Sequence, residues 1–555
     1  MSVSASATAE NVSLSSPEMR KIVFASSLGT VFEWYDFFLY GALATIIAKR
    51  FFSGLNDTSA FIFALLAFAA GFVIRPLGAM VFGHLGDVIG RKYTFLATIL
   101  IMGLSTFLVG VLPSYETIGV AAPICLISLR LLQGLALGGE YGGAATYVAE
   151  HAPSDRRGLH TGFIQVTAAV GLLLSLLVIL ACRLSTGKDF DVWGWRIPFL
   201  FSSILLAISV YIRVQLNESP LFKRMKSEGK LAKRPLSEAL GNFKNVKVML
   251  AALFGLTAPE AVVWYTCQFY ALFFLTNALK IEAATSNLLI VIALVGTAPL
   301  YVVFGWVSDL IGRKTVTMAG FLLAAIAILP IFKGLTHYGN PALEAAVARN
   351  PVTVYADPAQ CSFQFDPIGK KVFRSPCDLV KGYLAKNAIP YTNAPALEAG
   401  KAAVSIGNSK VESFDGRLID AAAFKAQQDS FNAEMAKALA DAGYPKTADP
   451  NAINYVMVLV LLGLLGVFST MVYASMAAWL VELFPTRIRY SSMSLPYHVG
   501  NGWFGGFVPS VAFALVSATG DVYRGLWYPI ITAIVGLIVG TFWLRNTRGG
   551  SLENH

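Results

Sequence analysis

Apolar residues fall into long runs along this chain, and short polar segments separate the runs. A helix needs about 20 mostly apolar residues, at about 1.5 Å each, to cross a bilayer. Twelve runs are close to that length, and they lie at residues 22–46, 59–83, 93–112, 119–149, 159–182, 193–213, 248–276, 284–307, 315–332, 453–481, 490–519 and 523–545. They are too long and too uniformly apolar for the strands of a membrane barrel. We therefore expect an all-α membrane protein with twelve transmembrane helices.

Lys and Arg residues are concentrated on one side of the expected membrane. The segments on that side contain 20 of them, and the short loops on the other side contain six. Because cytoplasmic loops are enriched in basic residues, both termini are expected to be cytoplasmic. Residues 1–19 have no apolar core and no basic head, which argues against a cleaved secretory signal. We expect a multi-pass protein of the cell inner (plasma) membrane, in contact with the lipid bilayer.

The composition excludes several other classes of protein. Hydrophobic residues make up 55% of the chain and charged residues 14%, against about 25% charged in soluble domains. Five Cys residues are too few for a disulfide scaffold. The formal charge of +10 is explained by membrane topology and lipid contact, so no nucleic-acid partner is expected.

Two motifs occur twice along the chain. GHLGDVIGRKYT at 83–94 matches GWVSDLIGRKTV at 305–316, with an offset of 305 − 83 = 222. EHAPSDRR at 150–157 matches ELFPTRIR at 482–489, with an offset of 482 − 150 = 332. The difference, 332 − 222 = 110, measures the extra sequence between the ninth and tenth helices. Both copies of each motif are expected on the cytoplasmic side, which predicts two six-helix bundles related by a parallel repeat.

The repeat defines the expected organisation of the chain. In order, we predict a cytoplasmic tail at 1–19, the N-terminal six-helix bundle at 20–213, a cytoplasmic linker at 214–247, helices 7–9 at 248–332, an insertion at 333–452, helices 10–12 at 453–545 and a cytoplasmic tail at 546–555. By topology the insertion lies outside the cytoplasm. Its end, at 418–443, has the apolar spacing of an amphipathic helix, with Phe424, Phe431, Met435 and Leu439 on one side.

Cys361 and Cys377 both fall in the insertion, where an oxidising compartment would favour a disulfide between them. Two unpaired thiols are the alternative.

The two G-x-x-x-D-x-x-G-R-K loops resemble the loop signature of the major facilitator superfamily. Three other segments, GTVFEWYDFFLYG at 29–41, RPLGAMVFGHLGD at 75–87 and LRLLQGLALGGEYGGA at 129–144, are similar to its metabolite:H+ symporter family. The resemblance covers nearly all of the chain except 1–19 and the insertion. It implies proton symport of an organic acid such as citrate, 2-oxoglutarate or shikimate, or of proline or betaine. The chain departs from the family pattern at Val88 and Leu310, where a basic residue is usual, in its insertion, and in its short C-terminal tail, which has no coiled coil.

Charged residues at membrane depth need a partner or a water-filled cavity. Glu33, Asp36 and Tyr40 share one face of the first run, and Arg130 lies at a similar depth in the fourth run, with Gln133 one turn further on. An ion pair between Asp36 and Arg130 would break when the acid is protonated, which is a route to proton coupling. In the superfamily such a pair often has that role. A static ion pair that fixes helix packing is the alternative, for Glu33 as well as for Asp36.

Other polar residues are candidates for substrate binding. Arg75, in the second run, could bind an anionic substrate or reach the loop network on the cytoplasmic side. The seventh run places Glu260, Trp264 and Tyr265 at mid-depth, after a Pro that suits a bent gating helix, and the eleventh run contains His498 and Asn501. Arg130 is the first candidate to bind a substrate carboxylate, with Arg75 as the second, and Tyr40 and Gln133 are further candidate substrate contacts. Helix packing is the alternative for the aromatic residues and for His498.

The repeated loop motifs suit a gate better than a substrate site. Asp87 with Arg91, and Asp309 with Arg313, can join helix ends on the cytoplasmic side and separate when the transporter switches state. The sequence contains no Walker A loop, HExxH, CxxC pair or G-x-S-x-G with suitable partners, so no enzyme and no metal site are expected.

Taken together, these patterns predict a proton-coupled symporter that imports a small organic carboxylate by alternating access. The expected partners are this solute and protons, with the proton as coupling ion, no cofactor, and a monomer as the working unit. Two alternatives remain open, which are a symporter of a zwitterionic osmolyte such as proline or betaine and a sensor on the same fold that transports nothing.

Overall fold

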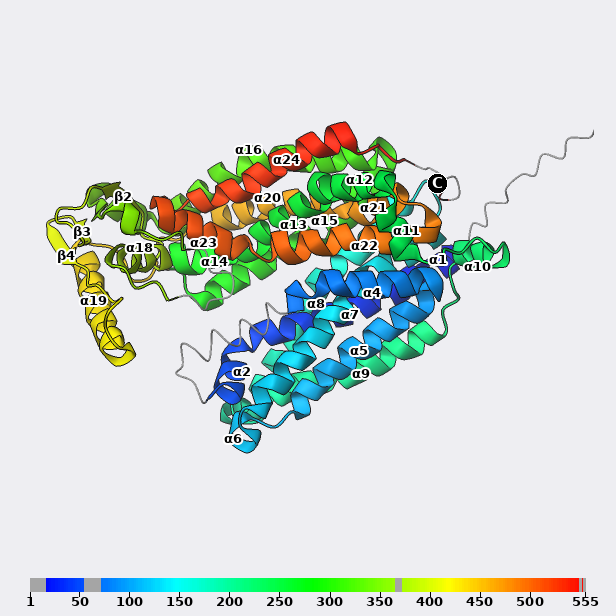
Figure 1. Ribbon diagram of the computed structural model, residues 1–555, viewed down its shortest axis with the longest axis horizontal. Coiled ribbons are helices and arrows are strands. Elements are labelled where there is room, and N and C mark those ends of the chain that lie inside the picture. Colours follow the sequence, from blue (N-terminus) through cyan, green and yellow to red (C-terminus); the bar gives the residue numbers. More distant parts are fainter. Residues whose placement is uncertain (1–15, 54–70, 365–371, 549–551, 553–555) are drawn as a thin grey trace, which may run out of the picture.

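The computed structural model describes residues 16–53, 71–364, 372–548 and 552. Two helical bundles lie side by side, and a smaller unit extends from one end of the second bundle (Figure 1). Within the described ranges, 11 helices are long and apolar enough to cross a membrane. The predicted run at 59–83 lies partly outside these ranges, and its described part overlaps the start of α4 (Arg75–Val88). The prediction of an α-helical membrane fold is confirmed.

The N-terminal bundle follows the predicted runs closely. Its long helices are α1 (Ser16–Ala42), α4, α5 (Arg91–Val111), α7 (Ala121–His151), α8 (Arg157–Thr186) and α9 (Arg196–Val214). Short helices at the turns are α2 (Ala44–Phe51), α6 (Tyr115–Ile118) and η1 (Gly187–Phe190). The end of the bundles at which α1 begins is named the terminal end, and the opposite end is named the insertion end.

The C-terminal bundle comes after a linker with two short helices, α10 (Pro220–Ser227) and α11 (Pro235–Gly241). Its first span is assembled from α12 (Phe243–Ala252), η2 (Leu253–Thr257), α13 (Ala258–Tyr265), η3 (Thr266–Tyr270), α14 (Ala271–Phe273) and η4 (Phe274–Ala278). The three η segments of this span are π-helical turns, and π turns often occur at functional sites. The first lies just before Pro259, which lacks the N–H needed for a regular helical bond.

The remaining elements of this bundle complete the repeat. They are α15 (Ala283–Ile311), α16 (Arg313–Gly339), α20 (Tyr455–Ala474), α21 (Met476–Leu483), η6 (Thr486–Ile488), α22 (Arg489–Val499), η7 (Gly500–Gly505), α23 (Val508–Thr519), η8 (Arg524–Leu526) and α24 (Trp527–Trp543).

The most extensive contacts between the bundles are those of α4 with α22 and of α8 with α15. Glycines bring the backbones together at both places. A Cβ atom at Gly83 would lie 2.9 Å from the Ser491 Cα, and one at Gly162 would lie 2.8 Å from the Tyr301 carbonyl oxygen. Since real Cβ atoms do not approach that closely, a larger residue at either position would separate the bundles there.

The insertion between α16 and α20 folds around its own core. Its helices are α17 (Pro341–Arg349), η5 (Pro358–Gln360), α18 (Pro376–Lys386) and α19 (Ala421–Asp441), and its strands are β1 (Val352–Tyr355), β2 (Tyr391–Ala394), β3 (Ala403–Ile406) and β4 (Ser409–Glu412). The sheet order is β2-β1-β3-β4, with β1 and β2 parallel and the other pairs antiparallel. The helical prediction did not include this sheet, because strands of four residues are too short to show a clear alternation of apolar and polar positions.

The amphipathic helix predicted at 418–443 is confirmed as α19, whose buried residues include all four predicted apolar positions. Cys361 and Cys377 form a disulfide that ties the segment after η5 to the first turn of α18.

The insertion is attached to the C-terminal bundle at α23. The Tyr391 N–H donates to the Gly520 carbonyl at 2.9 Å, and the Tyr391 hydroxyl donates to the Ser517 carbonyl. The Ser517 hydroxyl in turn donates to Gln364 at 2.9 Å. Backbone hydrogen bonds are specific in direction and distance, so these contacts fix the insertion to one bundle.

Candidate functional site

A group of buried polar side chains lies where the two bundles meet. Arg75, the first residue of α4, is 3% exposed, and its guanidinium carbon lies 4.3 Å from the Phe72 ring centre and 5.0 Å from that of Phe37. The Nε and Nη2 atoms of Arg75 have no hydrogen-bond partner among the described residues. Buried donors are almost always paired in folded proteins. Two unpaired donors on one guanidinium therefore indicate a position for a ligand or for water.

Residues of the C-terminal bundle complete this group. His498 on α22 is 2% exposed, and neither of its ring nitrogens has a partner in the described part of the chain. Glu260 on α13 is buried beside Asn501, and its Oε2 atom is likewise unpaired within those ranges. Tyr265 lies next to Arg75. The structure thus brings together residues that the sequence predicted separately on the second, seventh and eleventh runs.

Aromatic side chains from both bundles surround these polar groups. The Tyr141 and Tyr497 rings stack across the bundle contact with centres 3.7 Å apart, and the hydroxyls of Tyr473 and Tyr497 are 2.9 Å apart. Trp264 donates its indole N–H to the Tyr301 hydroxyl at 2.9 Å. Such a lining is typical of small-molecule sites, in which a few polar groups fix the orientation of the ligand.

Asp36 and Arg130 lie inside the N-terminal bundle. Asp36 accepts a hydrogen bond from Ser202 and lies beside Thr106. Arg130 donates to Gln133, and Gln133 donates to the Thr106 hydroxyl at 2.8 Å. Among the described residues no direct ion pair joins Asp36 to Arg130, so the pair predicted from the sequence is not observed, and Thr106 and Gln133 connect the two groups instead.

Tyr40 completes this second group, because its ring centre lies 4.2 Å from the Arg130 guanidinium carbon. Arg130, Tyr40 and Gln133 thus contact one another within the N-terminal bundle. The predicted substrate residues form two sets, one at the bundle contact around Arg75 and one around Asp36.

A third polar group was not predicted as a set. Glu140 on α7 forms an ion pair of 2.8 Å with Arg213 on α9, and Glu33 lies beside both. Arg213 is the last residue of the sixth predicted run, and no role was predicted for it. Its position within an apolar run was the available signal.

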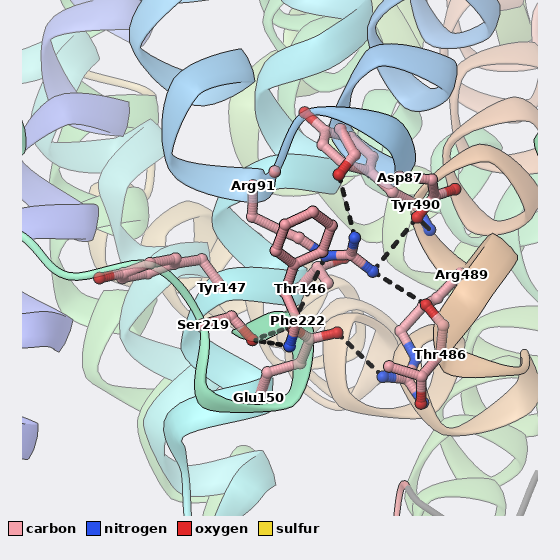
Figure 2. Close-up of polar contacts among 12 residues, drawn as sticks. Asp87, Arg91, Thr146, Tyr147, Glu150, Ser219, Phe222, Thr486, Arg489 and Tyr490 are labelled. Carbon is pink, nitrogen blue, oxygen red and sulfur yellow. Dashed lines mark hydrogen bonds and ion pairs between the residues drawn. The ribbon is translucent and has the colours of Figure 1, made fainter. Parts of the chain in front are cut away.

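The repeated motifs form two ion-pair clusters at the terminal end. In the first, Arg91 lies 3.2 Å from Asp87 and 3.7 Å from Glu150, and Glu150 also pairs with Arg489 at 3.0 Å (Figure 2). Arg91 donates to the Thr486 carbonyl at 2.9 Å. Asp87, Arg91 and Glu150 belong to the N-terminal bundle. Thr486 and Arg489 belong to the C-terminal bundle, so the cluster joins the two.

The carboxylate of Asp87 makes a second connection in this cluster. It accepts hydrogen bonds from the Ser491 backbone N–H at 2.9 Å and from the Ser491 hydroxyl at 2.8 Å, in the first turn of α22. A carboxylate is favourable at a helix N-terminus because the backbone N–H groups there are unpaired.

The second cluster repeats the first with the bundles exchanged. Asp309 and Arg313 form an ion pair, Arg313 lies 3.2 Å from Glu482, and Glu482 pairs with Arg157 at 2.6 Å. Asp309 accepts hydrogen bonds of 2.8 Å from the backbone N–H groups of residues 158 and 159, at the start of α8. Glu150, Arg157, Glu482 and Arg489 were recognised in the sequence as a repeat but not as ion-pair partners of the Asp–Arg motifs. The matching offsets were the available signal.

Comparisons with known proteins agree with this architecture. A family model described as "Sugar (and other) transporter" matches residues 21–254. The chain is 37% identical over 329 residues to the inner membrane metabolite transport protein YhjE of Escherichia coli (strain K12), covering 58% of this chain and 74% of that protein. It is 37% identical over 328 residues to the shikimate transporter of the same strain, with 58% and 74% covered. It is 34% identical over 325 residues to the proline/betaine transporter of that strain, with 57% and 64% covered.

Among solved structures, the fold is similar to that of the proton:xylose symporter XylE. The TM-score is 0.60 at 15% identity, and the alignment covers 97% of this chain and 98% of that one.

Proposed function

Because the chain belongs to the major facilitator superfamily of membrane transporters, we propose that it is a proton-coupled symporter that imports a small organic carboxylate by alternating access. The observation that carries the substrate proposal is the buried Arg75 guanidinium, with two unpaired donors at the bundle contact. Transport itself follows from the family, and the shikimate transporter among the relatives supports a carboxylate.

A carboxylate that enters a buried site needs donors to replace its lost water. The planar guanidinium of Arg75 offers two N–H groups in the geometry that a carboxylate accepts. His498 and the Glu260–Asn501 pair provide further hydrogen-bonding atoms on the opposite bundle. A solute between them would contact both bundles at once, which suits a site about which the bundles rock. We assign substrate binding first to Arg75, Glu260, Tyr265, His498 and Asn501.

Proton coupling is assigned to Asp36 and Arg130, with no cofactor. Thr106, Ser202 and Gln133 link this acid and this guanidinium within one bundle. Protonation of Asp36 removes the charge that attracts Arg130, so Arg130 can change its contacts with Tyr40 and Gln133. Because the Asp36 group and Arg75 lie in the same bundle, such a shift can reach the substrate site.

The two ion-pair clusters would serve as the gate. Positive charge in the loops assigns the terminal end to the cytoplasm and the insertion end to the outside, with both termini cytoplasmic. With both clusters closed, the cytoplasmic end is sealed, as expected of an outward-facing or occluded state. The working unit would be a monomer in the inner (plasma) membrane, with no nucleic-acid partner.

A zwitterion such as proline or betaine is the second candidate substrate. Trp264, Tyr265 and the buried Glu260 could receive the cationic nitrogen of such a zwitterion through cation–π and charge contacts. The similarity to a proline/betaine transporter supports this alternative.

Uptake by the purified full-length protein in liposomes tests the proposal. Radiolabelled shikimate, 2-oxoglutarate, proline and glycine betaine would be offered with and without an inward proton gradient. We expect a carboxylate to accumulate only when the gradient is imposed. If proline and betaine accumulate and neither carboxylate does, the second candidate replaces the first. If nothing moves by uptake or counterflow, the sensor alternative is favoured.

A further inference from the structure

A separate charged group lies inside the N-terminal bundle, toward the terminal end from Asp36. Glu33 on α1, Glu140 on α7 and Arg213 on α9 are at most 4% exposed. Arg213 donates through Nη2 to Glu140 Oε1 at 2.8 Å and through Nη1 to the Phe95 carbonyl at 2.8 Å. Its guanidinium carbon lies 3.4 Å from the Phe95 ring centre. Arg213 is therefore fixed in direction by three contacts, two of which involve Phe95.

The helix packing provides space for this guanidinium. A Cβ atom at Gly29 would overlap the Arg213 side chain, so α1 can pass Arg213 closely only because residue 29 is glycine. The same close approach brings Glu33, one turn further along α1, beside Glu140.

Glu33 and Glu140 together can carry two negative charges, and Arg213 beside them supplies one positive charge. The Oε2 atom of Glu140 receives no hydrogen bond from an N–H or O–H group of the described residues, and the Glu33 carboxyl is its neighbour. If both buried carboxyls were ionised, the group of three would keep a net negative charge, which a buried site strongly disfavours. The charges therefore balance when the two carboxyls hold one proton between them.

The other groups near the pair do not neutralise its second negative charge. Arg75, on α4, also acts electrostatically on Glu33, and it is itself assigned to the substrate. Asp36 adds negative charge one turn along α1. The Tyr490 hydroxyl, from α22, donates to the Gly139 carbonyl next to Glu140. The α5 residues at this position, Phe95 and Thr98, are uncharged.

Polar groups continue from this pair toward the terminal end. The hydroxyls of Ser26 and Ser27, about two turns before Glu33 on α1, are buried and have no partner within the described ranges. Asp36, Glu33 and these two hydroxyls thus follow one another along α1 toward the terminal end. Buried unpaired hydroxyls are positions at which ordered water is commonly found.

We propose that Glu33 and Glu140 share one proton beside Arg213 and that this pair relays the coupling proton between Asp36 and the terminal end. This relay rests on the proposed proton symport. In the step, the O–H bond on Asp36 breaks and one forms on Glu33, while the proton already shared with Glu140 leaves toward Ser26 and Ser27. Arg213 acts as the positioning residue, because it keeps Glu140 as the partner that is ionised.

Infrared difference spectra of the full-length protein in lipid, without solute, test the shared proton. The carboxylic-acid C=O band at neutral pH should lose the intensity of one group in Glu33→Gln and in Glu140→Gln. In Arg213→Gln it should gain intensity, because both acids would then be protonated. Glu228 belongs to an exposed ion pair, so Glu228→Gln is the control and should change nothing. If neither Glu33→Gln nor Glu140→Gln reduces the band, the shared proton is disproved. Glu33→Gln and Glu140→Gln test the shared proton independently, so if one variant does not fold, the other still decides the result.

The relay is tested separately with shikimate as the probe, by a pH dye trapped in liposomes. Shikimate-driven proton entry should be abolished by Glu33→Gln as it is by Asp36→Asn, while solute exchange continues. Normal proton entry in Glu33→Gln would overturn the relay. Absence of shikimate transport in the unmodified protein would instead count against the proposed function, and the infrared result would still decide the shared proton.

Discussion

The Arg75 guanidinium combines burial with unpaired donors, and its geometry leads to the first prediction. Arg75→Lys keeps the charge but loses the planar fork, so at least one charge-assisted hydrogen bond to a carboxylate is lost. Such a bond is worth about 1.5–3 kcal/mol, which corresponds to a KM about ten to a hundredfold higher. Arg75→Gln should abolish uptake. The measurement is initial uptake rate against solute concentration in liposomes.

Arg224, on the exposed linker helix α10, offers a matched control. Arg224→Lys should leave KM unchanged. An unchanged KM in Arg75→Lys as well would mean that the carboxylate binds elsewhere.

Asp36 leads to the second prediction, on coupling. Asp36→Asn retains the size of the side chain and can still accept the hydrogen bond from Ser202, so the bundle should fold normally. It cannot carry the coupling proton. We expect exchange of solute to continue and accumulation against a gradient to disappear. Asp189→Asn, at an exposed acid of the insertion end, should accumulate solute normally. Accumulation by Asp36→Asn in a pH-driven assay would exclude Asp36 as the coupling acid.

At the scale of helices, the two ion-pair clusters predict how the gate responds to mutation. Glu150→Gln removes the carboxylate between Arg91 and Arg489 and leaves two buried guanidiniums beside each other. Loss of one partner of a buried pair costs about 3–5 kcal/mol. The closed terminal end should therefore open more often. Ser494→Cys, buried on α22 behind the cluster, should then react faster with a thiol reagent.

The second cluster provides an internal comparison for this result. Glu482→Gln should have the same direction of effect, because Glu482 pairs with Arg157 and Arg313 in the same way. Glu228→Gln changes only an exposed pair and should not alter the reaction rate at residue 494. Unchanged rates in both cluster variants would show that the clusters do not hold the gate closed.

The sequence predicted the spans well because a transmembrane helix must be apolar along its whole length. It could not predict partners between helices. Arg213 contacts Glu140, 73 positions away, through a space that exists only because Gly29 lacks a side chain. The gate was closer to prediction, since its residues recur at fixed offsets. The four short strands of the insertion carried no usable pattern, whereas α19, with 21 residues, did.

For the whole molecule, the position of the insertion has a consequence for motion. The Tyr391 hydroxyl donates to the Ser517 carbonyl of α23, in the C-terminal bundle, and the Ser517 hydroxyl donates to Gln364. If the two bundles rock against each other during transport, the insertion must move with the C-terminal bundle. Its separate core, around residues such as Val354, Val404 and Met435, allows it to move as a rigid unit.

The last prediction concerns the side of the membrane on which this unit lies. Ser430 is exposed on α19, and Ser227 is exposed on the linker helix α10, at the other end of the molecule (Figure 1). In a background that lacks Cys125, Cys182 and Cys267, Ser430→Cys should react with a membrane-impermeant maleimide in intact cells. Ser227→Cys should react only after the membrane is permeabilised, because the positive charge of the linker predicts a cytoplasmic position. The reverse pattern would invert the topology, and with it the assignment of the two ion-pair clusters to a cytoplasmic gate.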